Sequence, residues 1–230
     1  MAVNKKLLQG AAAAAPGGLT PSEHFGVVLY EGDGSSSHSI NGGKFGAGAY
    51  FNGSNGYINF SDRVFNVPLN GTLSEFSISL WFNASSVPSS GNVEFLSWWQ
   101  TGTQTYKDGF LGLTTISSNS IRFGDDWQNA YTFSSTSEMV NQWYHLVAVK
   151  TSTNAYIYLN GQLESTKGSA LDWGFNNFLA IGRQHTAGEY FDGKLDQVRL
   201  FSKALSSSEV STLYAETAET VESLDPLSED

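Results

Sequence analysis

The chain has 230 residues and a formal net charge of −10, although only 15% of its residues are charged. Six acidic residues lie between positions 216 and 230, so the rest of the chain carries −4 (−10 + 6). A body this close to neutral, with no basic stripe, excludes nucleic acid as an expected partner. No apolar run reaches the ~18 residues of a membrane-spanning helix, so we expect no membrane insertion. Cysteine is absent, which excludes disulfides and a thiol nucleophile.

The composition predicts one large all-β domain. Glycine occurs 24 times and aromatic residues make up 13% of the chain, a combination typical of tight turns and half-buried strands. A single sandwich often has this length. We divide the chain into an Ala/Gly-rich N-terminal arm (1–24), a strand-rich body (25–214) and an acidic tail (215–230). The arm and the tail have little to bury, so we expect both to extend from the body.

About a dozen short segments of the body are typical of strands separated by Gly/Ser-rich turns, which indicates a sandwich or barrel. Residues 75–83 alternate most clearly, with Phe76, Ile78, Leu80 and Phe82 on one face. The dipeptide Asn160-Gly161 predicts a two-residue hairpin. The predicted strands are 26–31, 48–51, 57–60, 75–83, 93–98, 110–116, 121–123, 142–150, 154–160, 162–166, 178–181 and 194–201.

One helix is predicted, over residues 206–216. Ser206 and Glu209 have the spacing of a capping box, in which each side chain bonds to the other residue's backbone N–H. Val210, Leu213 and Tyr214 lie on one helical face. We expect this face to pack against the edge of the sandwich.

Five strand residues carry individual expectations. Trp81 is expected to fill the space between the sheets, as is Trp143, because a buried indole makes many core contacts. His145, in an alternating strand, is expected to be a hydrogen-bonded structural residue. Asp196 and Arg199 are three apart on one strand, so we expect them to point to opposite faces.

Five motifs of the body, in this order, resemble those of the laminin-G-like, concanavalin A-like jelly rolls. They are Phe51-Asn-Gly-Ser-Asn-Gly-Tyr-Ile58, Phe76-Ser-Ile-Ser-Leu-Trp-Phe82, Trp143-Tyr-His-Leu-Val-Ala-Val149, Tyr158-Leu-Asn-Gly161 and Phe191-Asp-Gly-Lys-Leu-Asp-Gln-Val-Arg-Leu-Phe201, the last followed by Ala204-Leu-Ser206. The resemblance covers roughly residues 45–214. It implies a two-sheet antiparallel jelly-roll sandwich, here with an extended N-terminal arm and one short C-terminal helix.

The start of the chain is similar to that of certain virion proteins of tailed bacteriophages, especially marine ones. The similar residues are 1–13, 28–35 and 39–40. This resemblance implies a protein on the surface of a phage particle, held to other virion proteins through its arm, and a homo-oligomer. Small side chains let such an arm lie flat in a groove between subunits. The alternative is a disordered tail.

The carboxylates lack the spacing of the related glycoside hydrolases, which carry an E-x-D-x-x-E pattern on one strand. The nearest groupings, Asp125-Asp126 and Asp192 with Asp196, have no Glu at that spacing. The chain also lacks the G-x-S-x-G, H-E-x-x-H and phosphate-binding loop motifs. We therefore expect a non-catalytic protein that requires no cofactor.

Aromatic and amide side chains gather in the predicted loops, and these residue types bind sugars by stacking and by hydrogen bonds to hydroxyls. The predicted carbohydrate-binding residues are Trp99, Tyr106, Asp125, Asp126, Trp127, Asn129 and His185, with Trp99 and Trp127 foremost. Many members of the resembled family bind Ca²⁺ at a rim of the sandwich. The candidate calcium ligands are Asp33, Asp62, Asp125 and Asp192, although Asn55 and Gly56 stand where relatives often have acids.

The sequence thus predicts a fibre, decoration or adsorption protein of a phage that binds carbohydrate on the host surface. One alternative is a structural spacer or cement protein of the capsid or tail, in which exposed aromatic side chains form subunit interfaces. A less favoured alternative is a polysaccharide depolymerase.

Overall fold

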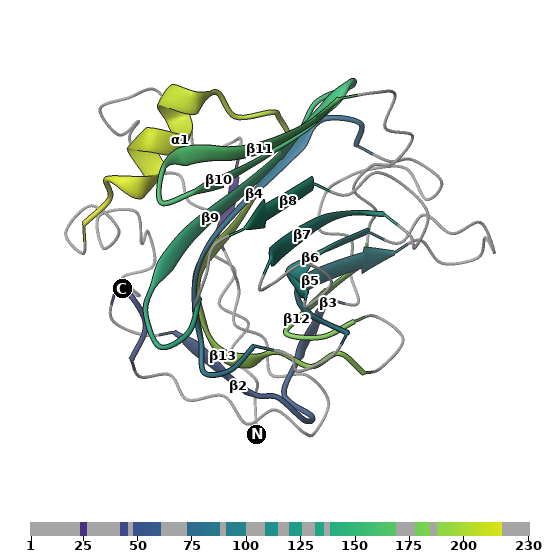
Figure 1. Ribbon diagram of the computed structural model, residues 1–230, viewed down its shortest axis with the longest axis vertical. Helices are drawn as coiled ribbons and strands as arrows, with labels where there is room; N and C mark the ends of the chain where they lie inside the picture. Colours follow the sequence, from purple (N-terminus) through teal and green to yellow (C-terminus); the bar gives the residue numbers. More distant parts are fainter. Residues whose placement is uncertain are drawn as a thin grey trace, which may run out of the picture.

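The computed structural model describes residues 24–26, 42–45, 48–60, 73–87, 91–99, 109–114, 120–125, 132–135, 139–168, 178–184 and 188–217; for 24–26, 59–60, 125, 132–135 and 178 it describes the backbone only. Within these residues the strands form two antiparallel sheets that face each other, with a short helix outside them (Figure 1). The predicted all-β, two-sheet sandwich with one C-terminal helix is confirmed. In the described part of the chain, no helix is long and apolar enough to cross a membrane.

The first sheet, seven-stranded in the described residues, has the order β1-β13-β4-β9-β10-β11, and β2 also pairs with β13. Asn160 and Gly161 join β10 to β11 with positive φ angles of 49° and 79°, which confirms the predicted hairpin. The strands are β1 (His24–Gly26), β2 (Ala49–Asn52), β4 (Phe76–Ala84), β9 (Tyr144–Lys150), β10 (Asn154–Leu159), β11 (Gln162–Gly168) and β13 (Asp192–Phe201).

The second sheet, six-stranded in the described residues, has the order β3-β12-β5-β6-β7-β8. Its strands are β3 (Ile58–Phe60), β5 (Asn92–Trp99), β6 (Gly109–Thr114), β7 (Ser120–Asp125), β8 (Thr132–Ser135) and β12 (Phe178–Ile181). β8 was not among the predicted strands, because its four residues include only one large apolar side chain. Of the predicted strand over 26–31, only Gly26 is described, and residues 27–31 lie outside the described residues.

The main core lies between the two sheets, where the inward residues of each strand meet. In β4 these are Phe76, Ile78, Leu80 and Phe82, as the alternation predicts. Phe76 packs edge-on against Trp98 of β5, with ring centroids 5.7 Å apart. Aromatic pairs of this kind bury large areas and prefer tilted or edge-to-face geometry, so they fix the two sheets face to face.

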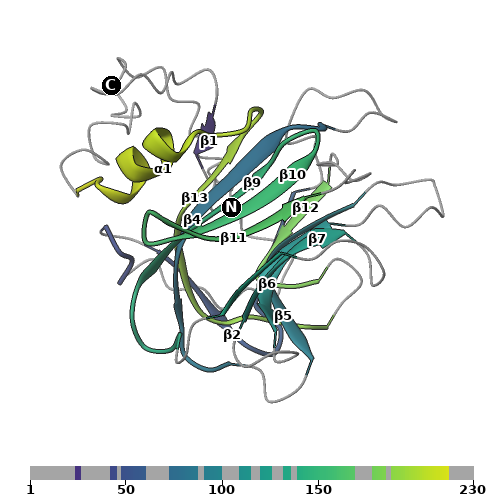
Figure 2. The ribbon, with the colours of Figure 1, turned by 45° about the horizontal axis from the view of Figure 1, so that its top comes forward.

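The helix α1 (Ser207–Tyr214) covers the outer side of the seven-stranded sheet beside β13 (Figure 2). Its predicted capping box is present: the Glu209 N–H donates to Ser206 Oγ, and the Ser206 N–H donates to Glu209 Oε2 at 2.7 Å. Val210 and Leu213 are buried in a second apolar cluster. The outward residues of the sheet that join this cluster include Val147, Val149, Tyr158 and Phe201.

Trp81 belongs to this outer side, so the prediction that it fills the space between the sheets is wrong. Its ring lies edge-on to Phe45 at 5.7 Å and stacks near Tyr214 at 5.9 Å. The Lys44 ammonium lies 4.5 Å from its centroid. The alternation of β4 requires this placement, because Leu80 and Phe82 on either side point into the main core. Trp143 is half-buried just before β9.

A bulge in β13 corrects the expectation for Asp196 and Arg199. Asp196 pairs with Trp81 and Arg199 with Ser79, so three steps on β13 match two steps on β4. Gln197 adopts φ of 47° inside the bulge. The extra residue puts both side chains on the same, outer face rather than on opposite faces.

Candidate functional site

Two of the predicted sugar-binding residues lie in described strands. Trp99 is the last residue of β5 and Asp125 the last of β7. The register pairs Trp98 with Gly109, and Gly109 with Asp125, so β5 and β7 end at the same end of the six-stranded sheet. The Trp99 side chain is half-buried, and Asp125 is described by its backbone only. The remaining five (Tyr106, Asp126, Trp127, Asn129 and His185) lie outside the described residues.

The predicted calcium ligands are not brought together by the described residues. Asp33 and Asp62 lie outside them, and the side chain of Asp125 is not described. Asp192 begins β13, and its Oδ2 accepts a hydrogen bond from Ser86 Oγ at 3.0 Å. Across the described part of the chain, no group of three or more His, Cys, Asp or Glu side chains is placed to hold a metal ion.

The outer face of the six-stranded sheet carries a set of polar and aromatic side chains. The inward residues Trp98, Leu111 and Phe123 belong to the main core, so the residues that alternate with them point outward. The register places Ser97 opposite Phe110, and Gly112 between Glu94 and Arg122. We call the following set the outer face: Asn92, Glu94, Ser97 and Trp99 of β5, Phe110 and Gly112 of β6, and Arg122 of β7.

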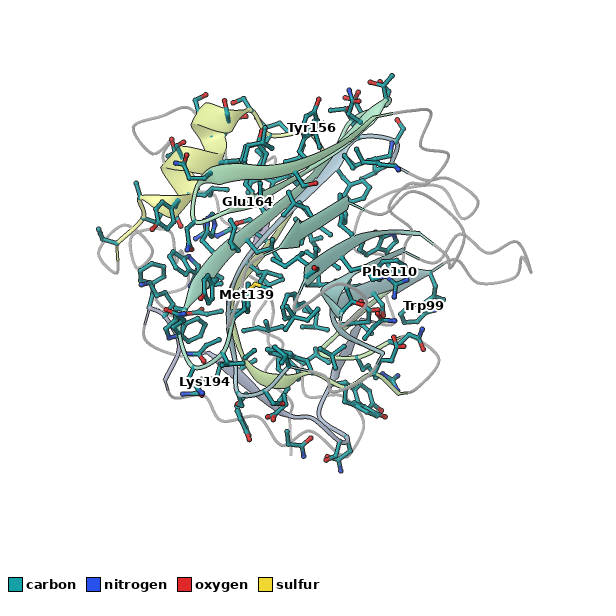
Figure 3. All side chains as sticks on the ribbon, in the orientation of Figure 1. Trp99, Phe110, Met139, Tyr156, Glu164 and Lys194 are labelled. Atoms are coloured by element: carbon teal, nitrogen blue, oxygen red, sulfur yellow. The ribbon has the colours of Figure 1, made fainter. Side chains whose placement is uncertain are left out.

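Aromatic rings and guanidinium groups are combined on this face. The Arg122 guanidinium lies 3.9 Å from the centroid of the Phe110 ring. Trp99 lies near Phe110 at the end of the sheet (Figure 3). Nearby, Arg183 lies 3.7 Å from the Tyr57 ring centroid. Phe110 and Arg122 are themselves buried, so this cation–π pair supports the sheet from beneath, and the half-buried Trp99 is the ring of the outer face that a sugar can reach.

Only Trp99 of this face was predicted from the sequence, and Glu94 is the most unusual of the residues that were missed. It is only 1% exposed, and its pKa is raised well above the ordinary value, first by burial and then by the charge of Glu189. The Arg122 guanidinium acts in the opposite direction but does not outweigh these effects. The carboxylate extends over Gly112, where a Cβ would lie 2.7 Å from Glu94 Oε2. Its being the one charged residue of β5 was the only signal in the sequence.

The outer side of the seven-stranded sheet is a packed, structural environment instead. His145 is 1% exposed, and its Nε2 is hydrogen-bonded to Ser79 Oγ at 3.0 Å, as expected for a structural histidine. Arg199 donates to Glu216 Oε1 at 2.7 Å and to Gln197 Oε1 at 2.9 Å. These contacts tie β13 to the end of α1 and leave the outer face of the six-stranded sheet as the candidate site.

Comparison with known proteins supports the architecture. Residues 52–211 match the family model described as the concanavalin A-like lectin/glucanases superfamily. A search of curated proteins found no match.

Solved structures with similar folds include carbohydrate-related domains. Domain 4 of AbnA, a GH43 extracellular arabinanase of Geobacillus stearothermophilus solved in complex with arabinotriose, has a TM-score of 0.58 and 19% identity, covering 83% of this chain and 86% of its own. The heptameric SAP-like pentraxin of Limulus polyphemus has a TM-score of 0.57 and 15% identity, covering 72% and 80%. A putative carbohydrate binding protein of Bacteroides ovatus has a TM-score of 0.51 and 19% identity, covering 71% and 45%. At these identities the likeness concerns the fold.

Proposed function

The chain belongs to the concanavalin A-like lectin/glucanases superfamily, and on this premise we propose that it is a non-catalytic carbohydrate-binding protein. The ligand binds on the outer face of the six-stranded sheet, at the end marked by Trp99. The observation that carries the proposal is that the half-buried Trp99 lies next to Phe110. The Phe110 ring in turn makes a cation–π contact with the Arg122 guanidinium. An aromatic platform with polar groups beside it offers a sugar both a stacking surface and hydrogen-bond partners.

Two similar structures support a carbohydrate as the ligand. Domain 4 of the Geobacillus arabinanase was solved with arabinotriose, and the Bacteroides protein is described as a putative carbohydrate binding protein. The predicted residues Tyr106, Asp126, Trp127 and Asn129 lie outside the described residues, in segments of the chain that begin or end at β5, β6 and β7 at the Trp99 end of the sheet.

The absence of catalysis is part of the same proposal. A glycosidase needs two carboxyl groups that reach opposite sides of the scissile bond. Glu94 and Glu189 lie together on the outer face, but Glu94 is 1% exposed and interacts directly with Glu189. A carboxyl group in this environment has no access to a glycosidic oxygen.

Display on a phage particle extends the proposal. It rests on the resemblance of residues 1–13 to virion proteins, with the arm binding other virion proteins and the domain facing a host-surface glycan. Apart from His24, the arm lies outside the described residues. Removal of residues 1–24 should abolish incorporation into particles while leaving glycan binding of the domain intact.

A glycan array followed by calorimetric titration with the best ligand tests the carbohydrate proposal. Trp99→Ala should weaken binding at least tenfold, which corresponds to about 1.4 kcal/mol. Trp143→Ala is the matched control, because Trp143 is also half-buried but lies next to β9 in the other sheet. Equal losses of glycan affinity in the two variants would contradict the proposal, as would a wild-type chain that binds no glycan. Retained self-assembly without glycan binding would favour the structural spacer. Release of reducing ends from a polysaccharide would instead indicate a depolymerase.

A further inference from the structure

Three side chains near the start of β5 have buried oxygen atoms without a hydrogen-bond partner. These atoms are Asn92 Oδ1, Glu94 Oε2 and Glu189 Oε2. We propose that the three side chains form a binding site for a hard divalent cation, with Ca²⁺ the ion that fits best. The site is distinct from the aspartates that the sequence suggested, and it does not depend on the proposed carbohydrate ligand.

The three groups lie in direct contact, although Glu189 is 95 positions from Glu94 (189 − 94). Asn92 Nδ2 donates to Glu189 Oε1 at 3.4 Å, and the two glutamate side chains are hydrogen-bonded to each other. The backbone fixes this arrangement, because the Glu94 N–H donates to the Glu189 carbonyl at 3.2 Å and Tyr190 forms a β-bridge with Glu94. The unpartnered oxygens therefore belong to one cluster.

Burial of this cluster requires a positive partner. The charges that act on Glu94 are those of Glu189 and Arg122, so a single guanidinium faces two carboxyl groups. A proton shared by the two glutamates removes one negative charge but satisfies only the oxygen pair between them. Asn92 Oδ1 would still lack a partner, and a buried acceptor without a partner is destabilising. One divalent cation satisfies all three groups at once.

The ligand chemistry selects a calcium-like ion. One amide and two carboxylates offer up to five oxygens (1 + 2 + 2), and water or backbone carbonyls can complete the six to eight that Ca²⁺ takes. All three groups bind through oxygen, whereas zinc sites are built mainly from Cys and His. Gly112 is essential to the space around the site, because a Cβ there would lie 2.7 Å from Glu94 Oε2.

Thermal unfolding of the full-length chain tests the proposal. The protein is treated with EDTA and then titrated with CaCl₂ to about 10 mM, at constant ionic strength and pH 7.5. A ligand of the folded state raises the unfolding temperature in a saturable way. We expect a rise of several degrees for the wild type, and isothermal titration calorimetry should give at least tenfold weaker binding for Glu94→Gln and Glu189→Gln. Glu164→Gln is the matched control, since Glu164 is exposed on β11 of the other sheet (Figure 3).

The variant Asn92→Asp distinguishes a bound cation from a proton shared by the two glutamates. It does so even if a glutamate variant fails to fold. A third carboxylate should strengthen Ca²⁺ binding and enlarge the calcium-dependent rise, because Ca²⁺ affinity increases with ligand charge. With only a proton in the cluster, the added charge would lower the unfolding temperature with and without Ca²⁺. The proposal is overturned if Ca²⁺ leaves the wild-type unfolding temperature unchanged, or if the response of Asn92→Asp is no larger than that of the wild type.

Discussion

His145 should make the free energy of unfolding depend on pH below neutrality. Its ring is 1% exposed, and burial together with the positive charge of Arg199 lowers its pKa to about 3. Nε2 is hydrogen-bonded to Ser79, whereas Nδ1 has no partner, so a protonated ring would bury an N–H without an acceptor. In the unfolded chain the pKa of histidine is about 6.5. Only the neutral form therefore fits the folded protein.

The sign and size of the effect follow from these two pKa values. Between about 3 and 6.5 the unfolded chain binds a proton that the folded protein does not, so acid favours unfolding. The contribution to stability is present in full above 6.5 and is lost as pH falls toward 3. At pH 5.0, which is 1.5 pH units below 6.5, the loss is about 2 kcal/mol at 1.36 kcal/mol per unit.

Urea denaturation at pH 7.5 and pH 5.0 measures this loss in the wild type and in His145→Gln. The wild type should lose about 2 kcal/mol more than the variant, a relative shift of the midpoint near 1 M for an m-value of about 2 kcal/mol/M. Other titrating groups cancel in the comparison. If His145→Gln loses as much stability between the two pH values as the wild type, the reasoning is refuted.

Three further variants test the packing, the helix cap and the ion pair, each by its urea midpoint. Gly109→Ala should destabilise by about 3 kcal/mol or more, because its Cβ would fall within 3 Å of the buried Trp98 indole; a loss below 1 kcal/mol would contradict this packing. Ser206→Ala removes the side chain that caps α1 and should cost about 1 kcal/mol, whereas Ser206→Asp should cost less. Glu216→Gln leaves the Arg199 guanidinium buried without its carboxylate and should cost about 3 kcal/mol, and an unchanged midpoint would show that the pair is not formed.

The alternation of the sequence was sufficient to predict most of the fold, because strand side chains alternate with a period of two. It placed Phe76, Ile78, Leu80 and Phe82 in the core, and the Asn160-Gly161 dipeptide predicted the hairpin. It failed where the period is interrupted: the bulge at Gln197 shifts Arg199 onto the same face as Asp196. Nothing in the local pattern marks such an insertion, since it depends on the register with β4.

The candidate site was predictable only in part. Trp99 could be identified because an aromatic pair at a strand end must place one ring inward and the other outward, and Trp98 is the inward one. Glu94 could not be, because its importance comes from Glu189, which pairs with it only in the folded chain. Trp81 shows the same limit: we expected it between the sheets, whereas Tyr214 and Phe45 cover it on the outer side, and that cover is tertiary.

The pairing of β13 has a consequence for the order in which the chain can fold. This strand, the last of the described strands along the chain, pairs with β1, β2 and β4 from the first half. Until residues 192–201 have been synthesised, β4 has an open edge of unpaired backbone groups beside its apolar side chains, the kind of edge that recruits other chains. Pairing over such sequence separations is slow. The docking of β13 thus limits how long the newly made chain stays prone to aggregation.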